Sequence, residues 1–293
     1  MAEIALALER ALERRRTRGE PGRAVAQVLA RGEGWSVGDV VCTSGPADAV
    51  FEEQHDWYSI AVVLAGTFQY RSRAGHAVMT PGSLMLGSPG QCFECGHEHA
   101  EGDRCVSFWY SAEYFERLAA DAGLASRGAF GVPRIPPLRA LAPMVAAAAA
   151  NVVDAAHAPW DEIGVALAVR AAALARGITA RHQSPTNAEA RVTQVVRWLD
   201  GSLQPSFTLA EMARSAGLSP YHFLRTFERL TGVTPHQYVL RRRLREAAVR
   251  LVARDDRIVD VALDCGFGDL SNFNRAFRAE FGLSPRAYRL RSR

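Results

Sequence analysis

The chain has 293 residues, of which 48% are hydrophobic, and its formal net charge is +4. This length is sufficient to bury two modest hydrophobic cores. No run approaches the roughly 18 consecutive apolar residues of a membrane-spanning helix, and the N-terminus lacks the layout of a signal peptide. Five cysteines without a secretory signal argue against a disulfide framework and favour the cytoplasm.

Residues 1–33 are expected to form a helical N-terminal extension. The helical pattern covers 3–30 and has a charged face, with a break between Gly19 and Gly22. The sequence pattern then changes. Over 34–135 short β-like runs are separated by Gly and Pro, which is typical of a small barrel or jelly roll. The predicted strands are 58–64, 66–71, 76–79, 83–86 and 105–110.

Cysteine and histidine gather on one short segment of this expected barrel. If residues 95–99 are extended, Cys95, His97 and His99 project to one face, because strand side chains alternate. Together with a further cysteine they could supply the thiolate and imidazole ligands that zinc prefers. Two hypotheses remain open: a metal or reactive-thiol site, or a polar strand and turn with semi-buried cysteines. The candidate residues are Cys92, Cys95, His97, His99 and Cys105.

The same domain holds aromatic residues that could line an effector cavity or simply form the barrel core. They are His55, Trp57, Tyr58, Phe68, Tyr70, Phe108 and Trp109. Of the remaining cysteines, Cys42 has no partner that the sequence reveals, and Cys265 is expected to be a small buried apolar residue.

Helices are predicted next, over 112–122 and 138–180. The segment 136–180 is alanine-rich and is a candidate for dimerisation. Residues 181–187 form a polar linker that contains a proline.

The last hundred residues contain one helix-turn-helix pattern written twice, at about 208–229 and 258–279. The two copies share eight identities, with a shift of 49 positions that becomes 50 after a single insertion. The matched pairs are Ala213 and Ala262, Gly217 and Gly266, Phe223 and Phe273, Arg225 and Arg275, Phe227 and Phe277, Gly232 and Gly282, Pro235 and Pro285, and Tyr238 and Tyr288. A duplicated unit of this kind can place two reading helices on one DNA duplex.

Each copy has its own physical logic. Gly217 and Gly266 fall at the turn between two helices, where a left-handed backbone favours glycine. Ser219 is expected to cap the next helix, with proline at its first position. Phenylalanines at helical spacing form an inward stripe in both copies, and the outward face carries arginine and asparagine, which pair with guanine and adenine edges.

Charge is concentrated in the same region. Residues 187–293 hold 18 Arg against 11 acidic residues, a net of +7, whereas the rest of the chain has a net of −3. A basic excess of this kind is what phosphate binding requires. The chain has no lysine. The cluster Arg241, Arg242, Arg243 and Arg245 is expected to combine phosphate contacts with a solvated face.

Residues 187–293 resemble the DNA-binding domain of AraC/XylS-type transcription regulators. The resemblance covers both copies, the helix that joins them, and the pattern Gly-Phe…Phe-x-Arg-x-Phe…Phe-Gly-x-Ser-Pro-x-x-Tyr-Arg at 266–289. The Pro81-Gly82-Ser83 turn before a strand is similar to the cupin-like sensor domains that precede such domains. By this resemblance the base-facing positions are Tyr221, Leu224, Arg225, Ser271, Asn272, Asn274 and Arg275.

The resemblance implies an α+β protein: a cupin-like β-barrel or jelly roll at 34–135 with flanking helices, and an all-α domain of two helix-turn-helix units at 188–293. It implies a bacterial, cytoplasmic, nucleoid-associated regulator of transcription that is not an enzyme and requires no cofactor. Expected partners are double-stranded promoter DNA, RNA polymerase, a small-molecule or metal effector such as zinc at the Cys/His cluster, and a second copy of the chain. The alternative is a cupin-type metalloenzyme with an appended nucleic-acid-binding domain.

Overall fold

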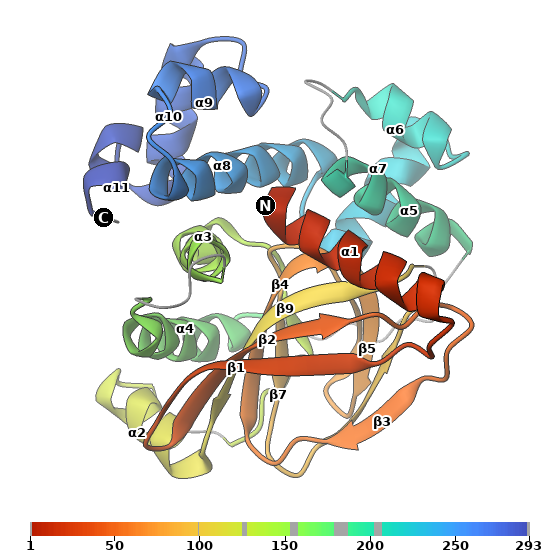
Figure 1. The fold of residues 1–293 in the computed structure, drawn as a ribbon, viewed down its shortest axis with the longest axis vertical. Coiled ribbons are helices and arrows are strands. Elements are labelled where there is room, and N and C mark those ends of the chain that lie inside the picture. The colour runs from red at the N-terminus through yellow and green to blue at the C-terminus, as the bar shows by residue number, and fades with distance from the viewer. Residues whose placement is uncertain are drawn as a thin grey trace.

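The computed structural model describes residues 2–98, 100–124, 128–152, 158–178, 187–201 and 207–291. A β-rich domain and a helical domain lie one above the other, and the N-terminal helix runs across the top of the sheets (Figure 1). The α+β class and the barrel followed by paired helix-turn-helix units are therefore confirmed. None of the helices within these ranges is long and apolar enough to cross a membrane.

Two antiparallel sheets form the β-rich domain, which we call the barrel domain. One has the strand order β1-β2-β9-β4-β7-β10 and the other β3-β8-β5-β6. The strands are β1 (Ala24–Gly32), β2 (Trp35–Cys42), β3 (Phe51–Gln54), β4 (Tyr58–Gly66), β5 (Phe68–Ser72), β6 (Gly75–Met79), β7 (Leu84–Gly87), β8 (Cys92–Gly96), β9 (Asp103–Tyr110) and β10 (Arg134–Ile135). All five strands predicted from the sequence are present, within a few residues of their expected ends.

The prediction of a helix through residue 30 is wrong. Helix α1 (Ala2–Arg18) ends before Gly19, and Ala24–Gly32 form β1, which pairs with β2 from Ala24↔Cys42 to Gly32↔Trp35. Alanine and leucine favour helix locally, but pairing with a neighbouring strand overrides that weak preference. Helix α1 instead packs Ile4, Leu8 and Leu12 against the core of the barrel domain.

Helices flank the barrel on one side (Figure 1). They are α2 (Ala112–Asp121), the short η1 (Arg139–Leu141), α3 (Ala142–Asn151) and α4 (Trp160–Ala175). Ser111 caps α2 by accepting a hydrogen bond from the backbone N–H of Tyr114. The predicted linker at 181–187 lies outside the described residues, apart from residue 187.

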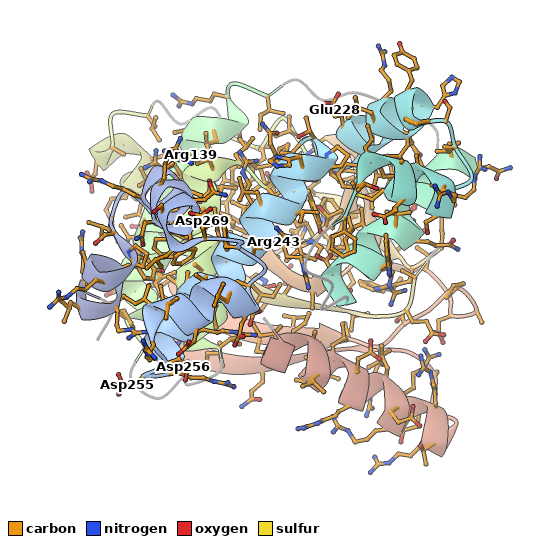
Figure 2. The ribbon with its side chains drawn as sticks, turned by 90° about the horizontal axis from the view of Figure 1, so that it is seen from above. Arg139, Glu228, Arg243, Asp255, Asp256 and Asp269 are labelled. Atoms are coloured by element: carbon orange, nitrogen blue, oxygen red, sulfur yellow. The ribbon has the colours of Figure 1, made fainter. Side chains whose placement is uncertain are left out.

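The helical domain contains α5 (Asn187–Gly201), α6 (Leu209–Ser215), α7 (Pro220–Thr231), α8 (Pro235–Ala253), α9 (Ile258–Asp264), α10 (Leu270–Phe281) and α11 (Pro285–Arg291). Helix α8 runs between the two units, with Glu228 on one side and Asp269 on the other (Figure 2). One apolar cluster holds the first unit together through Phe223 and Phe227, and a second does so for the other unit through Phe273 and Phe277.

The two domains share a packed interface. Ala142 and Ala146 of α3 belong to the same buried cluster as Leu244 of α8. Small residues on α3 allow the two helix backbones to approach closely. On the other side, Val78 of β6 belongs to the cluster of the first unit. The barrel domain, together with its flanking helix α3, therefore contacts both units.

Candidate nucleic-acid interface and sensor cavity

Helix α7 presents a polar face to solvent while its apolar stripe is buried. Gly217 has φ of +59° and Ser219 accepts a hydrogen bond from the N–H of His222, as the sequence predicts. Phe223 and Phe227 are fully buried. At the outer face Tyr221 is 65% exposed, and the Arg225 guanidinium lies 5.9 Å from the centre of its ring. A cation–π contact at an exposed site stabilises by about 0.5–1 kcal/mol, so it favours one relative arrangement of these two side chains.

Helix α10 has the same layout with a different start. Asp269 caps it, because its carboxylate accepts a hydrogen bond from the N–H of Asn272 at 2.7 Å. Gly266 has φ of +82°, in agreement with its predicted place in the turn. The guanidinium of Arg275 donates to Oδ1 of Asn272 at 3.4 Å. The outer face of α10 therefore presents the amide of Asn272 and the guanidinium of Arg275 to solvent as a hydrogen-bonded pair.

The structure brings the seven predicted base-facing residues onto two helix faces. Six are exposed, and only Leu224 is half-buried. Three lie on α7 and four on α10. Their exposure is compatible with base reading, and their role in it stays a prediction.

The expectation of a solvated face for the arginine cluster on α8 is wrong, and its phosphate contacts stay a prediction. Arg245 is only 4% exposed and donates to the carbonyl of Pro81, while Arg241 donates to the carbonyl of Pro137. Arg242 donates to the carbonyl of Asp200, and Arg243 to that of Gly266. Arg241 and Arg245 thus bond across to the barrel domain, whereas Arg242 and Arg243 bond to other elements of the helical domain. The exposed arginines of the helical domain lie elsewhere: Arg191, Arg214, Arg225, Arg229, Arg254, Arg257, Arg275, Arg278, Arg286 and Arg291.

The barrel domain contains a cavity of about 450 Å³ that is partly open to solvent. Of the seven aromatic candidates, His55, Trp57, Phe68 and Trp109 line it. Tyr58 and Phe108 instead belong to the core on the other side of the sheet. Phe51, Met85 and Phe93 also line the cavity; the predicted effector cavity did not include them.

His55 is held rigidly in this wall. Its ring stacks on Phe93 at 4.0 Å, and its Nε2 lies 2.9 Å from the hydroxyl of Tyr70. That hydroxyl donates its own proton to the carbonyl of Leu86, so Nε2 of His55 must be the donor to Tyr70. Burial lowers the pKa of His55 to about 4, which keeps the imidazole neutral.

The Cys/His cluster differs from the predicted one. Cys42, His97 and Asp103 come together in the cavity wall, with their ligand atoms all within 4.8 Å of one another. Cys95 and Cys105 are buried nearby and line the same cavity. Cys92 is exposed, because it alternates with buried Phe93, and His99 lies outside the described residues.

His97 joins the cluster by hydrogen bonds. Its Nε2 lies 2.8 Å from Oδ1 of Asp103, and the thiol of Cys105 donates to Oδ2 of the same carboxylate at 3.3 Å. Burial by itself lowers the pKa of His97, but hydrogen bonding and charge from Asp103 and Cys42 raise it to about 9. Burial raises the pKa of the Cys95 and Cys105 thiols, so neither has the accessible, easily ionised thiol of a fast electrophile sensor.

Two family models match the chain in sequence. The AraC-like ligand binding domain matches residues 39–170, and a helix-turn-helix domain matches residues 212–291. The transcriptional activator AarP of Providencia stuartii is 31% identical over 99 residues, which is 34% of this chain and 73% of AarP. The chain belongs to the AraC family of transcriptional regulators. The resemblance seen in the sequence is thereby confirmed.

Other relatives match over shorter shares of their length. The transcriptional activator RhaS of Klebsiella pneumoniae (strain 342) is 36% identical over 107 residues, 36% of this chain and 38% of RhaS. The match therefore spans less than two fifths of RhaS. Among solved structures, the DNA-binding domain of AdpA in complex with a target DNA is 33% identical, covering 34% of this chain and 91% of that chain with a TM-score of 0.34.

Proposed function

We propose that this chain is a sequence-specific DNA-binding regulator that inserts α7 and α10 into successive major grooves of promoter DNA. The observation that supports it is the exposure of six of seven base-facing side chains on two helices whose apolar stripes are buried. In the helix-turn-helix geometry the N-terminal residues of a recognition helix contact base edges. Tyr221 and Ser271 lie in the first turn of their helices.

The cavity of the barrel domain would receive the signal. Stacked His55 and Phe93, with Trp57 and Trp109, suit a planar or apolar small molecule. Contacts of the barrel domain with both units would convert a change at the cavity into a change of DNA affinity. A second copy of the chain and RNA polymerase, in the bacterial cytoplasm, are the further partners of this proposal. The metalloenzyme alternative is less favoured, because the relatives are named as transcriptional activators.

Binding to the operator recovered by genome-wide footprinting tests this function. Arg275→Ala should weaken operator binding by about 1–3 kcal/mol and relax base preference at one half-site, while binding to a scrambled duplex changes little. Arg286→Ala is the matched control, because Arg286 is an exposed arginine on α11, outside both recognition helices. Equal losses on operator and scrambled DNA for Arg275→Ala would remove the assignment of that residue to base reading.

A further inference from the structure

One wall of the cavity holds a thiol, an imidazole and a carboxylate that the DNA-binding function does not use. Cys42 at the end of β2 and Asp103 at the start of β9 are directly opposed in the antiparallel ladder. Opposed residues in such a ladder project to the same face with Cβ atoms about 4.5–5.5 Å apart. The sheet therefore sets the separation of the thiol and the carboxylate, and His97, just after β8, completes the group.

The group is buried, and His97 and Asp103 share a proton within it. The side chain of Asp103 is 7% exposed, and the neighbouring Arg104 is paired with Asp39 at 2.7 Å instead. A buried carboxylate is costly unless a cation balances it, and the His97 imidazolium, paired with Asp103 at 2.8 Å, is that cation when no metal is bound. The side chain of His97 is 1% exposed, and its Nδ1 has no hydrogen-bond partner among the described residues. Because Nδ1 and Nε2 lie on opposite sides of the ring, a cation that also binds Asp103 would take Nε2, where it displaces the proton shared with the carboxylate.

We propose that Cys42, His97 and Asp103 form a binding site for a zinc-class divalent cation in the wall of the barrel cavity. Thiolate, imidazole and carboxylate are the ligands that zinc takes, at about 2.0–2.3 Å. Ligand atoms of a tetrahedral site at those distances lie about 3.3–3.8 Å apart, so the observed limit of 4.8 Å requires a closure of roughly 1 Å. All three residues line the cavity, which leaves the fourth position for water or a cavity ligand.

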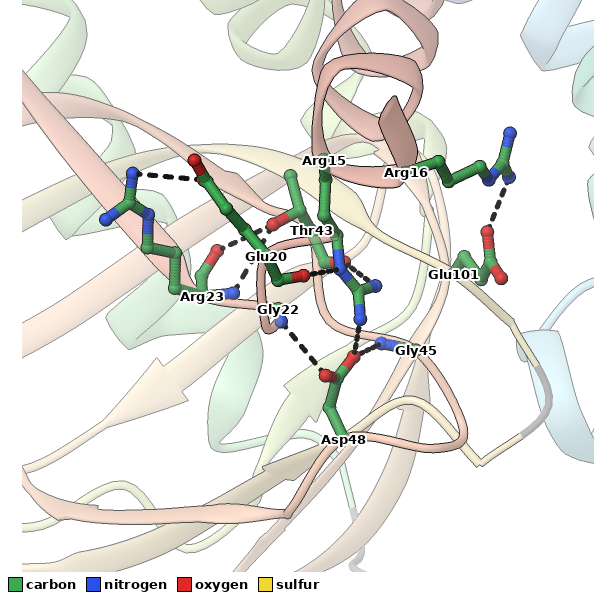
Figure 3. A network of polar contacts seen from close by, with 9 residues as sticks. All are labelled: Arg15, Arg16, Glu20, Gly22, Arg23, Thr43, Gly45, Asp48 and Glu101. Carbon is green, nitrogen blue, oxygen red and sulfur yellow. Dashed lines mark hydrogen bonds and ion pairs between the residues drawn. The ribbon is translucent and has the colours of Figure 1, made fainter. Parts of the chain in front are cut away.

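The site is connected to the helical domain through Glu101, which lies two residues before Asp103. The Glu101 carboxylate pairs with Arg16 of α1 at 2.5 Å (Figure 3). Its carbonyl accepts a hydrogen bond from Arg197 of α5 at 2.8 Å. A cation that draws Asp103 and His97 toward Cys42 also displaces Glu101. Occupation of the site is therefore transmitted to α5, and this regulatory step rests on the proposed function.

The Cys42 side of the site is also linked to α1 by polar contacts. Arg15 of α1 donates to the carbonyl of Thr43, next to Cys42, and pairs with Asp48 at 2.5 Å (Figure 3). Helix α1 thus contacts the segments on both sides of the site. Closure of the site would therefore shift the position of α1 on the barrel domain and also change the hydrogen bond between Arg197 and Glu101.

Titration of the chelator-treated full-length protein with Co²⁺ tests the site. The visible absorption of Co²⁺ reports a tetrahedral site, and its near-ultraviolet charge-transfer band reports a thiolate ligand. We expect saturation at about one equivalent per chain and displacement by Zn²⁺. Cys42→Ser should lose the charge-transfer band and His97→Gln the saturable binding. Cys92→Ser, at the exposed cysteine of β8, should retain both.

No saturable absorption in the wild-type protein, or a charge-transfer band that persists in Cys42→Ser, would overturn the site. Alkylation of Cys42 much faster than Cys92, without Co²⁺ binding, would overturn it in favour of a reactive thiol. Hydrogen exchange of the wild-type protein with and without Zn²⁺ needs no variant that might misfold. It should show added protection around Glu101 and in α5, and no change there would overturn the transmission. None of these measurements uses DNA, so a failure of operator binding would leave them unaffected.

Discussion

The two recognition helices end on equivalent glycines that differ in one respect. Gly232 and Gly282 close α7 and α10 with φ of +80° and +77°. A Cβ atom at Gly232 would lie 2.5 Å from Cβ of Pro136 in the barrel domain, whereas nothing lies within 4 Å of one at Gly282. Alanine at either position imposes the same backbone strain, but only alanine at position 232 would clash with the barrel domain, at Pro136.

The expected costs follow from these contacts. A left-handed backbone costs alanine about 1–2 kcal/mol relative to glycine, and this applies to both variants. The proline ring cannot rotate away, so Gly232→Ala must move backbone by roughly 1 Å, and overpacking of this kind costs about 1–3 kcal/mol more. We expect Gly282→Ala to lose about 1–2 kcal/mol and Gly232→Ala about 2–5 kcal/mol.

Hydrogen exchange and thermal unfolding of the two full-length variants distinguish the cost of backbone strain from the cost of the clash with Pro136. Gly282→Ala should increase exchange only near the end of α10. Gly232→Ala should also expose amides on the facing segment of the barrel domain, around β10 and β6, and should lower the unfolding temperature further. Equal losses in both variants, with no change in the barrel domain, would show that the contact with Pro136 carries no energy.

Two further predictions concern the turn and the cavity. Gly266→Val should abolish specific DNA binding while the barrel domain unfolds at its usual temperature, since valine resists φ of +82°, and retained operator affinity would contradict this. The pKa of His55 is lowered to about 4 in the folded protein, below its unfolded value near 6.5. The stability that the neutral imidazole contributes is therefore fully present above pH 6.5 and is lost as the pH falls toward 4. The free energy of unfolding, measured by near-ultraviolet circular dichroism during heating, should fall by up to about 3 kcal/mol between pH 6.5 and pH 4. His55→Phe should flatten this dependence of stability on pH, and an unchanged dependence would refute the assignment.

The repeated units could be predicted accurately because their signals are local. A cap at Ser219, glycines at the two turns and phenylalanines at helical spacing all fall within a few turns of helix, and the structure has each of them. Their pattern also occurs twice, which removes most of the ambiguity of a short motif. The strand at Ala24–Gly32 has no such signal, because its pairing with β2 decides its conformation.

The cluster around Cys42 shows what local pattern cannot provide. Cys42 lies 55 residues before His97 in the sequence. Only the register of β2 on β9 places it opposite Asp103. Proximity in the sequence makes Cys92 a candidate ligand, yet strand alternation puts it on the outer face. The arginines of α8 show a related limit, because the segments that accept their hydrogen bonds are distant in sequence: the barrel domain for Arg241 and Arg245, and other elements of the helical domain for Arg242 and Arg243.

The contacts between domains are where the proposed signal would act on DNA reading. Arg134 of β10 donates to the carbonyl of Val78 at 2.6 Å and also to that of Leu230, at the end of α7. Burial lowers its pKa to about 10, but at neutral pH it stays charged and complements the negative end of the α7 dipole. On the other side α3 packs with α8 and the second unit through Ala142 and Ala146. Two recognition helices can enter successive grooves only at one relative spacing. Because the barrel domain contacts one unit through Arg134 and the other through α3, a displacement between these two attachments changes that spacing directly.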